Sequence, residues 1–440
     1  MPPSEVPLSA LRDPFYVGSV QRLFEVPGDP ASMVCETTAV GSVFDVGAIF
    51  SIEGSDLGRA VFRHVLYTRL GQPEVWQEMA QRLETEGGLD AGQREELSSG
   101  LLQRYCQTGA KTHHLGMLDA KTGKLASAGL PEHESTYNVV RRFEVKKPPQ
   151  VKFFGQPLYD YAEFPGRDQY VVPLEVIVRF GLTSGSSVYK KYVKLGEQQR
   201  LAFQQELGLD EPLEAWQYLR RPIVDFTTKF EPEDRPVSKQ EAILISGLSA
   251  QQFIDLGKLA VLGAWIVRHM VEEMGLRLWD LKWEFARDGD DLVFVDTIDT
   301  DSIRATGVAE RGGHRFAIHF NKQAMRDYYE IAHADWMAAV NRTKALARTS
   351  GQRFVELLRA GQAAGDYPMD PEVDPGFMAI QVKKTALIKD RILERISAEE
   401  AREGLAQAGA DELEFYDGIG KLQELAARNA ISDPESLKID

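Results

Sequence analysis

The chain is poor in cysteine, with only Cys35 and Cys106 among its 440 residues. Two cysteines so far apart match neither the spacing of a zinc site nor a disulfide framework. Proteins of reducing compartments use cysteine in this sparing way, so we expect a cytoplasmic protein.

Long apolar runs are also missing. The most apolar stretch, Leu256 to Val267, contains Gly and Lys and is shorter than the ~20 residues that a spanning helix needs. The first residues, MPPSEVPLSALRDP, have neither the basic start nor the apolar core of a signal peptide. We therefore expect no leader peptide and no membrane partner.

An excess of positive charge is absent, because the formal net charge is −15. A nucleic-acid-binding protein would carry a basic stripe, so this class is not expected. An anionic small molecule remains a candidate ligand, since a local basic pocket can form in an acidic protein. The sequence also lacks a P-loop, a dinucleotide fingerprint and a nucleophile elbow.

The segment from Trp279 to Arg304, WDLKWEFARDGDDLVFVDTIDTDSIR, predicts a β-hairpin with charges in unusual places. Lys282 and Glu284 share one face of the first strand, because side chains alternate along a strand. If Asp288 pairs with Leu292 across the turn, Glu284 lies opposite an aspartate, Asp296.

Two facing carboxylates repel each other unless a cation lies between them. Oxygen ligands of this kind suit Mg²⁺, which one or two carboxylates hold together with phosphate oxygens. The alternative is a surface hairpin with a solvated acidic end. A shift of one residue in the register would send the two acids to opposite faces.

Two arginines mark candidate anion sites. Arg179 ends the strongly β-type segment 170–180 and precedes a Gly/Ser turn at 183–187. A guanidinium beside free N–H groups and hydroxyls suits a phosphate or carboxylate. The alternative is a strand-end arginine that reaches solvent. Arg304, which follows the acids, is either a second anion ligand or a partner in a plain ion pair.

Other segments outline the organisation of the chain. Short strands are expected over 15–50, helices over 56–70, 73–105 and 250–274, and further helices over 321–346 and 350–364. We expect an N-terminal β-rich domain over 1–115, an insertion or connection over 116–168, an α/β catalytic domain over 169–330 and a helical extension over 331–440. The extension either packs on the catalytic domain or mediates self-association, and the sequence leaves both open.

Several stretches, in one order, resemble the SAICAR synthetase family. PLEVIVRFGLTSGSSVYKKY (173–192), RPIVDFTTKFEPEDRPVS (221–238), the hairpin 279–304 and NKQAMRDYY (321–329) are similar to its motifs. VGSVQRLFEV (17–26) and SVFDVG (42–47) resemble its N-terminal elements more faintly.

The resemblance implies an α+β fold of two domains, with antiparallel sheets and the site in the cleft between the domains. It implies an ATP- and Mg²⁺-dependent ligase that activates the carboxylate of an aminoimidazole ribonucleotide as an acyl phosphate and couples it to the amine of aspartate. The expected partners are therefore an anionic nucleotide and an amino acid.

The resemblance also assigns roles. Glu284 and Asp296 would hold Mg²⁺. Lys282 would face the phosphates, and Lys282, Lys229 and Asp301 would be the catalytic residues. The nucleotide would be bound by Gly18, Gln21, Arg22, Lys282 and Glu284. The substrates would be bound by Arg179, Ser186, Lys190, Glu231, Asp234, Ser302 and Arg304.

The chain departs from the family where lysines usually meet the ATP phosphates, since Ser19 and Gln21 occupy those places. Each lost charge-assisted bond is worth about 1.5–3 kcal/mol, so we expect ATP affinity to fall about a hundredfold or more unless other segments compensate. Three alternatives stay open: a diverged enzyme of specialised nucleoside biosynthesis, a non-catalytic nucleotide-binding protein, and a small-molecule phosphotransferase.

Overall fold

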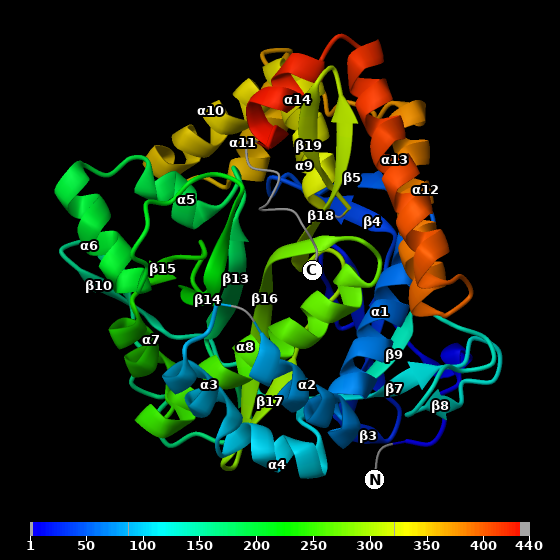
Figure 1. Cartoon of the computed structure of the whole chain (residues 1–440), viewed down its shortest axis with the longest axis vertical. Coiled ribbons are helices and arrows are strands. Elements are labelled where there is room, and N and C mark those ends of the chain that lie inside the picture. The colour runs from blue at the N-terminus through cyan, green and yellow to red at the C-terminus, as the bar shows by residue number, and fades with distance from the viewer. Residues whose placement is uncertain (1–2, 87, 321, 432–440) are drawn as a thin grey trace.

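The computed structural model describes residues 3–86, 88–320 and 322–431 (Figure 1). This part of the chain combines helices with largely antiparallel sheets, so the predicted α+β class is confirmed. No helix among these residues is long and apolar enough to cross a membrane.

An N-terminal sheet has the strand order β1-β2-β3-β9-β7-β8. Its strands are β1 (Tyr16–Val17), β2 (Gln21–Val26), β3 (Asp29–Thr37), β7 (His114–Leu118), β8 (Leu125–Ala126) and β9 (Tyr137–Arg141). Strands from both sides of the boundary expected at residue 115 therefore belong to one sheet. Two small ladders stand apart from it: β4 (Val40–Ser42) with β5 (Ala48–Ser51), and β10 (Gln150–Phe153) with β11 (Gln156–Tyr159).

The larger sheet follows the path β15-β14-β13-β16-β17-β6, with β12, β18 and β19 attached beside it. Its strands are β6 (Lys111–Thr112), β12 (Tyr170–Val171), β13 (Leu174–Leu182), β14 (Gln217–Thr228), β15 (Pro236–Val237), β16 (Arg277–Asp288), β17 (Asp291–Val295), β18 (Ile303–Arg311) and β19 (His314–His319). Every residue of β13 is buried, as its continuous apolar run predicts.

Strand β16 is the centre of this sheet because it changes partners along its length. Residues 280–283 pair with β13 and residues 277–281 with β18, whereas residues 284–288 pair with β17. The change falls at Glu284. Glu284 therefore lies where β16 passes from its ladders with β13 and β18 to its ladder with β17.

Helix α8 (Ala250–Glu272) packs on β13 and β16 and begins with the predicted capping box of Ser249 and Gln252. The expected helical hairpin over 73–105 is instead three helices: α2 (Pro73–Thr85), α3 (Ala91–Ser98) and α4 (Leu101–Thr108). Three short helices connect the strands of the large sheet: α5 (Ser187–Tyr192), α6 (Glu197–Leu207) and α7 (Lys239–Ser246).

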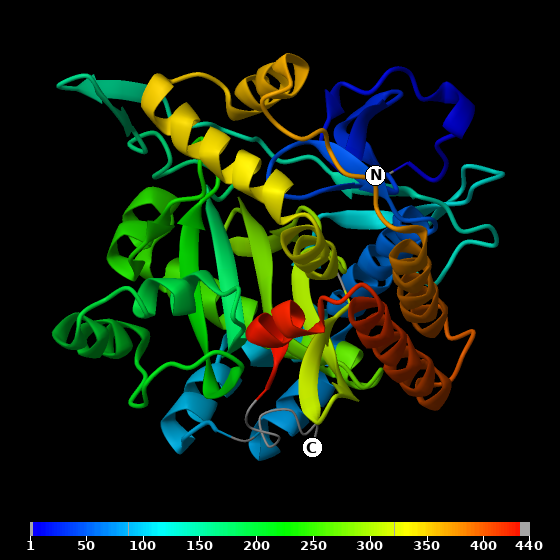
Figure 2. The same ribbon diagram turned by 90° about the horizontal axis from the view of Figure 1, so that it is seen from above.

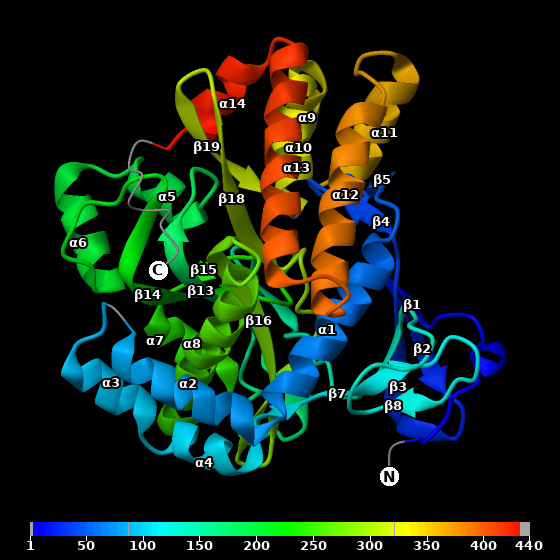
Figure 3. The same cartoon turned by 45° about the vertical axis from the view of Figure 1, so that its right-hand side comes forward.

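Helix α1 (Ser55–Leu70) is central to the molecule. It contacts β3 and β7 of the N-terminal sheet on one side and α12 (Pro375–Ile392) on another. Figure 3 shows α12 and α13 (Ala398–Gly418) running side by side next to α1. The C-terminal extension therefore packs onto the rest of the chain, as one of the two expected alternatives has it.

The remaining C-terminal helices are α9 (Lys322–Ala332), α10 (Ala334–Ser350), α11 (Phe354–Ala364) and α14 (Leu422–Asn429). The single helix expected over 321–346 is wrong, because the backbone leaves the helical region at His333 and divides α9 from α10. Asn321, where that helix was expected to begin, lies outside the described residues. Figure 2 shows α10, in yellow, and α14, in red, on different sides of α9, which both helices contact.

Candidate active site

The hairpin β16–β17 forms as predicted, but its register differs from the prediction by one residue. Asp288 pairs with Asp291, one position earlier on the return strand than expected, because the turn contains only two residues. Glu284 therefore lies opposite Val295, and the predicted pairing of Glu284 with Asp296 in the ladder is wrong.

Asp296 nevertheless turns its carboxylate back toward Glu284. It follows directly after β17 and adopts a left-handed backbone conformation with φ of 63°. Few residues other than glycine take this conformation, and aspartate is one of them. Lys229 contacts both Glu284 and Asp296, so the turn brings the two carboxyl groups to one ammonium group.

Two lysines accompany the acid pair. Lys229 contacts Glu284, and its ammonium lies 3.3 Å from Asp296 Oδ2. Lys282 lies 3.2 Å from Glu284 Oε1 and contacts Glu175 of β13. The predicted acids and lysines thus form one cluster, to which Glu175 belongs although the sequence analysis did not name it.

The electrostatics of the cluster favour an added cation. Burial, assisted by the charge of Asp296, raises the pKa of Glu284 to about 8. Burial also disfavours charge on Asp296, but the positive charges of Lys229 and Lys282 hold the pKa of Asp296 below its usual range. The pair therefore shares a proton near neutral pH, which a divalent cation would replace.

The donor set fits Mg²⁺ in chemistry. Glu284 and Asp296 supply two carboxylates, and Mg²⁺ commonly takes one or two and completes its octahedron with water and substrate phosphates. The Asp296 side chain is 32% exposed, so the pair is open to solvent on one side. Among the described residues, no group of three or more His, Cys, Asp or Glu side chains is arranged so that it could hold a metal ion, so a cation here would depend on two carboxylates and on its other ligands.

Helix α1 contributes residues that the sequence analysis missed. Arg59, Arg63 and Tyr67 lie four residues apart and so share one face of the helix. Arg59 Nη1 lies 2.8 Å from Asp301 Oδ2, and Arg63 Nη2 lies 3.2 Å from Asp299 Oδ2. The two arginines thus pair with two aspartates of the segment that follows β17.

The third residue of this face supports the acid pair itself. Tyr67 is buried, and its hydroxyl lies 2.9 Å from the carbonyl oxygens of both Val295 and Asp296. The phenol therefore fixes the backbone where Asp296 takes its left-handed conformation. The four-residue spacing of these polar side chains on a helix is the one signal in the sequence that could have drawn attention to them.

A cavity of about 40 Å³ adjoins the start of α1, the start of α9 and α12. Asp301, Arg59 and Lys322 lie on its walls. Burial raises the pKa of Asp301 while Arg59 opposes this, and burial lowers the pKa of Lys322. The cavity has room for a few water molecules only. A nucleotide would need a larger cavity than this one. The catalytic role of Asp301 therefore stays a prediction.

Arg179 is buried and engaged by two carboxylates. Its Nε and Nη2 lie 2.7 and 2.9 Å from the two oxygens of Asp225, and its Nη1 lies 3.1 Å from Asp280 Oδ2. Burial opposes its charge, but Asp225 and Asp280 raise its pKa. The alternative of a solvent-reaching arginine is wrong, because Arg179 is only 3% exposed. Its role as an anion ligand stays a prediction.

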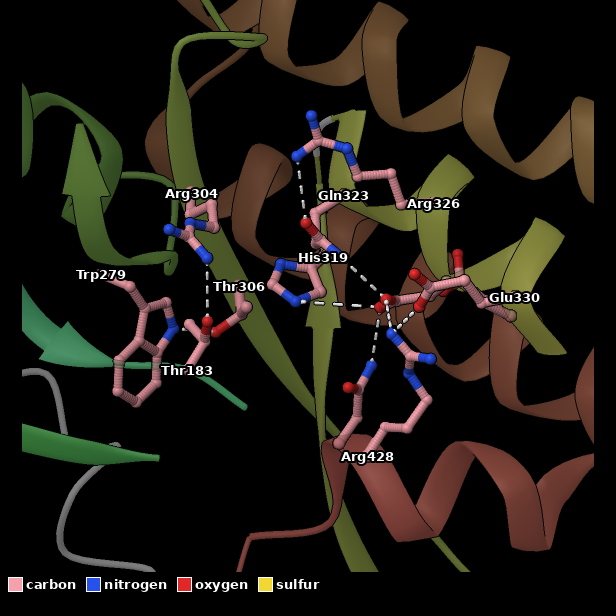
Figure 4. Close-up of polar contacts among 12 residues, drawn as sticks. Thr183, Trp279, Arg304, Thr306, His319, Gln323, Arg326, Glu330 and Arg428 are labelled. Atoms are coloured by element: carbon pink, nitrogen blue, oxygen red, sulfur yellow. Dashed lines mark hydrogen bonds and ion pairs between the residues drawn. The ribbon is translucent and has the colours of Figure 1, made fainter. Parts of the chain in front are cut away.

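Arg304 lies beside this network on β18. It forms a two-pronged ion pair with Asp280, with distances of 2.8 Å from Nε and from Nη2. Its Nη1 donates to Thr183 Oγ1 at 3.2 Å (Figure 4). The contact with Thr183 ties Arg304 to the Gly/Ser turn after β13, as expected for one shared site.

Arg326 on α9 differs from Arg179 and Arg304, which both pair with carboxylates. It forms no ion pair within the described part of the chain, and its Nη1 donates to Gln323 Oε1 at 3.4 Å. Burial and the neighbouring positive charge of Arg304 lower the pKa of Arg326. Two half-buried guanidinium groups near each other are stabilised by an anion, so Arg304 and Arg326 outline a candidate anion site (Figure 4).

The predicted serines and Lys190 have different surroundings. Ser186 is buried at the N-cap of α5, and its hydroxyl has no hydrogen-bond partner in the described structure. Lys190 is exposed on α5 and makes no ion pair with any described residue. The Ser302 hydroxyl is occupied in a turn, since it accepts from Asp299 N at 2.8 Å and donates to Asp299 O at 3.1 Å.

Glu231 and Asp234 differ in the surroundings and in the partners of their carboxylates. Both oxygens of Glu231 are engaged, by Tyr161 at 2.9 Å and by Arg235 at 3.0 Å. Asp234 lies near the lysine–acid cluster: burial and the charge of Glu175 raise its pKa. Of the two, Asp234 is therefore the better placed for a substrate amine.

The N-terminal turn with Gly18, Gln21 and Arg22 connects β1 and β2, and Gly18 N donates to Gln21 O at 2.8 Å. Arg22 has a half-exposed side chain and lies 3.5 Å from Glu36. Figure 3 shows this hairpin at the outer side of the N-terminal sheet. The structure thus forms the expected turn, and its contact with a nucleotide stays a prediction.

Comparison with known proteins gives one consistent family. A family model described as SAICAR synthetase matches residues 122–343. A protein of Archaeoglobus fulgidus, provisionally named phosphoribosylaminoimidazole-succinocarboxamide synthase, is 32% identical over 241 residues, covering 54% of this chain and 65% of that protein. The phosphoribosylaminoimidazole-succinocarboxamide synthase of Thermoplasma volcanium is 31% identical over 166 residues, covering 37% of this chain and 54% of that protein.

The chain thus spans between 54% and 65% of the length of these two relatives. Among solved structures, the SAICAR synthase of Saccharomyces cerevisiae in complex with SAICAR aligns with 92% of this chain and 97% of its own. That alignment has 19% sequence identity and a TM-score of 0.45.

Proposed function

The chain belongs to the SAICAR synthetase family, and from this premise we propose that it is an ATP- and Mg²⁺-dependent ligase. It would join the carboxylate of an aminoimidazole ribonucleotide to the amine of aspartate in purine biosynthesis. The observation that carries the proposal is the pairing of Glu284 with Asp296, beside Lys229 and Lys282, on the sheet that also bears Arg304.

The reaction needs three anions in one place: the phosphates of ATP, the carboxylate to be activated and the aspartate. The γ-phosphoryl group passes to the substrate carboxylate, which gives an acyl phosphate and ADP. The aspartate amine then attacks the acyl carbon, and phosphate leaves. Positioning and charge stabilisation are the main tasks of a protein in phosphoryl transfer.

The residues of the chain divide these tasks. Glu284 and Asp296 would hold Mg²⁺, which when bound neutralises charge on the phosphates. Lys282, whose pKa Glu284 and Glu175 raise against the effect of burial, stays protonated to face a phosphoryl group. Lys229 carries a second fixed positive charge to the same place.

The arginines of the site would bind the ribonucleotide. Arg304 and Arg326 offer guanidinium groups to a phosphate or carboxylate, and Ser186 offers a buried hydroxyl without a partner among the described residues. Asp234, whose pKa Lys282 and Lys229 influence, would accept a proton from the aspartate amine.

One observation favours a second candidate function. The turn at residues 18–21 carries Ser19 and Gln21 in place of lysines, and Arg22 there is paired with Glu36. A weaker hold on ATP phosphates fits a diverged member that acts on a related nucleotide in specialised nucleoside biosynthesis. The substrate would then differ while the cation and the acyl-phosphate chemistry stay the same.

A reaction with all components separates the candidates. Protein is mixed with ATP, Mg²⁺, aspartate and the carboxylated aminoimidazole ribonucleotide, and ADP and products are followed by mass spectrometry. ADP formation that needs both co-substrates, with a product heavier by aspartate minus water, supports the ligase. ADP together with a phosphorylated product in the absence of aspartate indicates a phosphotransferase, and absence of ADP contradicts the proposal.

A further inference from the structure

The C-terminal helix α14 contacts a buried carboxylate of α9, that of Asp327. Asn429 Nδ2 lies 3.0 Å from Asp327 Oδ2, and Arg428 Nη2 lies 3.4 Å from Asp327 Oδ1 (Figure 4). Asp327 is only 4% exposed, so these contacts replace water for its negative charge. Arg428 also pairs with Glu330, which lies on α9 like Asp327.

The same carboxylate also holds a residue of the candidate anion site. Gln323 Nε2 donates to Asp327 Oδ1 at 2.9 Å, and Gln323 Oε1 accepts from Arg326 Nη1 at 3.4 Å (Figure 4). An amide has one donor end and one acceptor end. Because Asp327 takes the donor end, the acceptor end of Gln323 must face Arg326.

This orientation matters for Arg326, which has no carboxylate partner in the described part of the chain and lies near Arg304. A flipped amide would turn its NH₂ group toward the guanidinium and drive it from this position. The series Asn429 and Arg428, then Asp327, then Gln323 therefore ends at the arginine that would meet an anionic substrate.

Backbone contacts anchor α14 independently of this series. Trp216 Nε1 donates to Arg428 O at 2.9 Å, and Ile431 N donates to Arg315 O at 2.9 Å. Loss of the Asn429 side chain therefore leaves the helix attached. This makes a side-chain variant of Asn429 informative about the site.

We propose that α14 helps to position the arginine that binds the anionic substrate. Arg428 and Asn429 are positioning residues that act through Asp327 and Gln323 to hold Arg326 in the orientation that binds the phosphate or carboxylate of the substrate. The proposal rests on the proposed function only for the identity of the substrate, because the arginine pair and its support are features of the structure alone.

The test compares Asn429→Leu, Arg326→Gln and the double variant with the wild-type protein. Leucine keeps the shape of asparagine and removes its donors. Lys421→Leu is the matched control, since Lys421 precedes the same helix and pairs only with exposed Glu424 among the described residues. Binding of two probes, the carboxylated aminoimidazole ribonucleotide and inorganic phosphate, is measured by calorimetry.

We expect Asn429→Leu to weaken binding of both probes about tenfold and Lys421→Leu to leave it unchanged. The double variant should bind no more weakly than Arg326→Gln alone, since residues that act in series are not additive. In turnover, Asn429→Leu should raise the KM for the ribonucleotide with little change in kcat. A structural defect would instead lower active protein without this split.

The outcomes separate the two proposals. If Asn429→Leu binds both probes like the wild-type protein, or if its effect adds fully to that of Arg326→Gln, the role of α14 is overturned while the ligase proposal stands. If the wild-type protein binds phosphate but not the ribonucleotide, and the variants follow the expected series, the role of α14 stands and the proposed substrate fails. If the wild-type protein binds neither probe, both are overturned.

Discussion

The ammonium of Lys229 lies 3.3 Å from Asp296 Oδ2 while it also contacts Glu284. A positive side chain thus bridges the two carboxyl groups that we propose as ligands of Mg²⁺. The lysine and a divalent cation compete for the same oxygens, so the protein exchanges one positive charge for another when the cation binds.

Replacement of Lys229 by methionine tests this competition. We expect Mn²⁺, a spectroscopic substitute for Mg²⁺, to bind the nucleotide-free variant about tenfold more tightly, because the competing ammonium is gone. Turnover should nevertheless fall steeply, because the phosphates lose a fixed charge. Lys239→Met, at an exposed position on α7, is the control. Weaker Mn²⁺ binding in Lys229→Met would contradict the competition.

Tyr67 should matter to the site although it touches no substrate. Tyr67→Phe leaves the carbonyl oxygens of Val295 and Asp296 without the phenol, at a cost of about 1–3 kcal/mol in the free energy of unfolding. The Mg²⁺ concentration needed for half-maximal activity should rise as well, because the Asp296 carboxylate is less well fixed. Tyr105→Phe, which loses a hydrogen bond from Arg104 elsewhere, should leave the cation requirement unchanged. Equal cation titrations for both variants would argue against the role of Tyr67.

Arg179→Ala should affect both stability and binding. The change leaves half-buried Asp225 without its arginine and removes one of the two arginines that pair with buried Asp280; removal of one partner of a buried pair costs about 3–5 kcal/mol. The fraction that folds should show a raised KM for the ribonucleotide. Denaturant unfolding and steady-state kinetics measure the two effects. An unchanged free energy of unfolding would mean that the two acids find other partners.

Acid should destabilise the protein through buried His319. Burial, together with Arg304 and Lys384, lowers the pKa of His319 from 6.5 to about 4, while Asp327 and Asp280 act in the opposite direction. Between these two values the unfolded chain binds the proton and the native chain does not. The stabilising contribution is therefore complete above about pH 6.5 and is lost toward pH 4, with a slope of up to about 1.4 kcal/mol per pH unit.

Denaturant unfolding at several pH values between 4.5 and 7 measures this slope. The slope should be smaller in His319→Gln. His314→Gln, at an exposed position on β19, should keep the wild-type slope. If His319→Gln loses stability with acid as steeply as the wild-type protein, His319 does not titrate as described.

The acid pair illustrates what the sequence could predict. Alternation and the Asp-Gly turn located the hairpin, and the resemblance identified Glu284 and Asp296. The exact register escaped prediction, because a two-residue turn and a longer one are both compatible with this sequence. The contact survives only because Asp296 adopts a left-handed conformation, and local patterns do not report such a backbone turn.

The support of the site was harder to predict because it joins segments far apart in the chain. Arg59, Arg63 and Tyr67 form a regular series on α1, but nothing local says that this face meets residues 295–301. Asn429 and Asp327 are likewise about a hundred residues apart and meet only in the folded chain. Periodicity predicts which residues share a face, whereas the tertiary structure decides what that face contacts.

The most direct test of the account is the binding of Mn²⁺ in the presence of ATP, followed by electron paramagnetic resonance. The wild-type protein should bind the ion, and Glu284→Gln should bind it at least about tenfold more weakly, with an unchanged circular dichroism spectrum and no turnover. Asp290→Asn, at the exposed turn of the same hairpin, should bind it like the wild-type protein. Equal Mn²⁺ affinity and retained turnover in Glu284→Gln would contradict the central claim that this acid pair holds the catalytic cation.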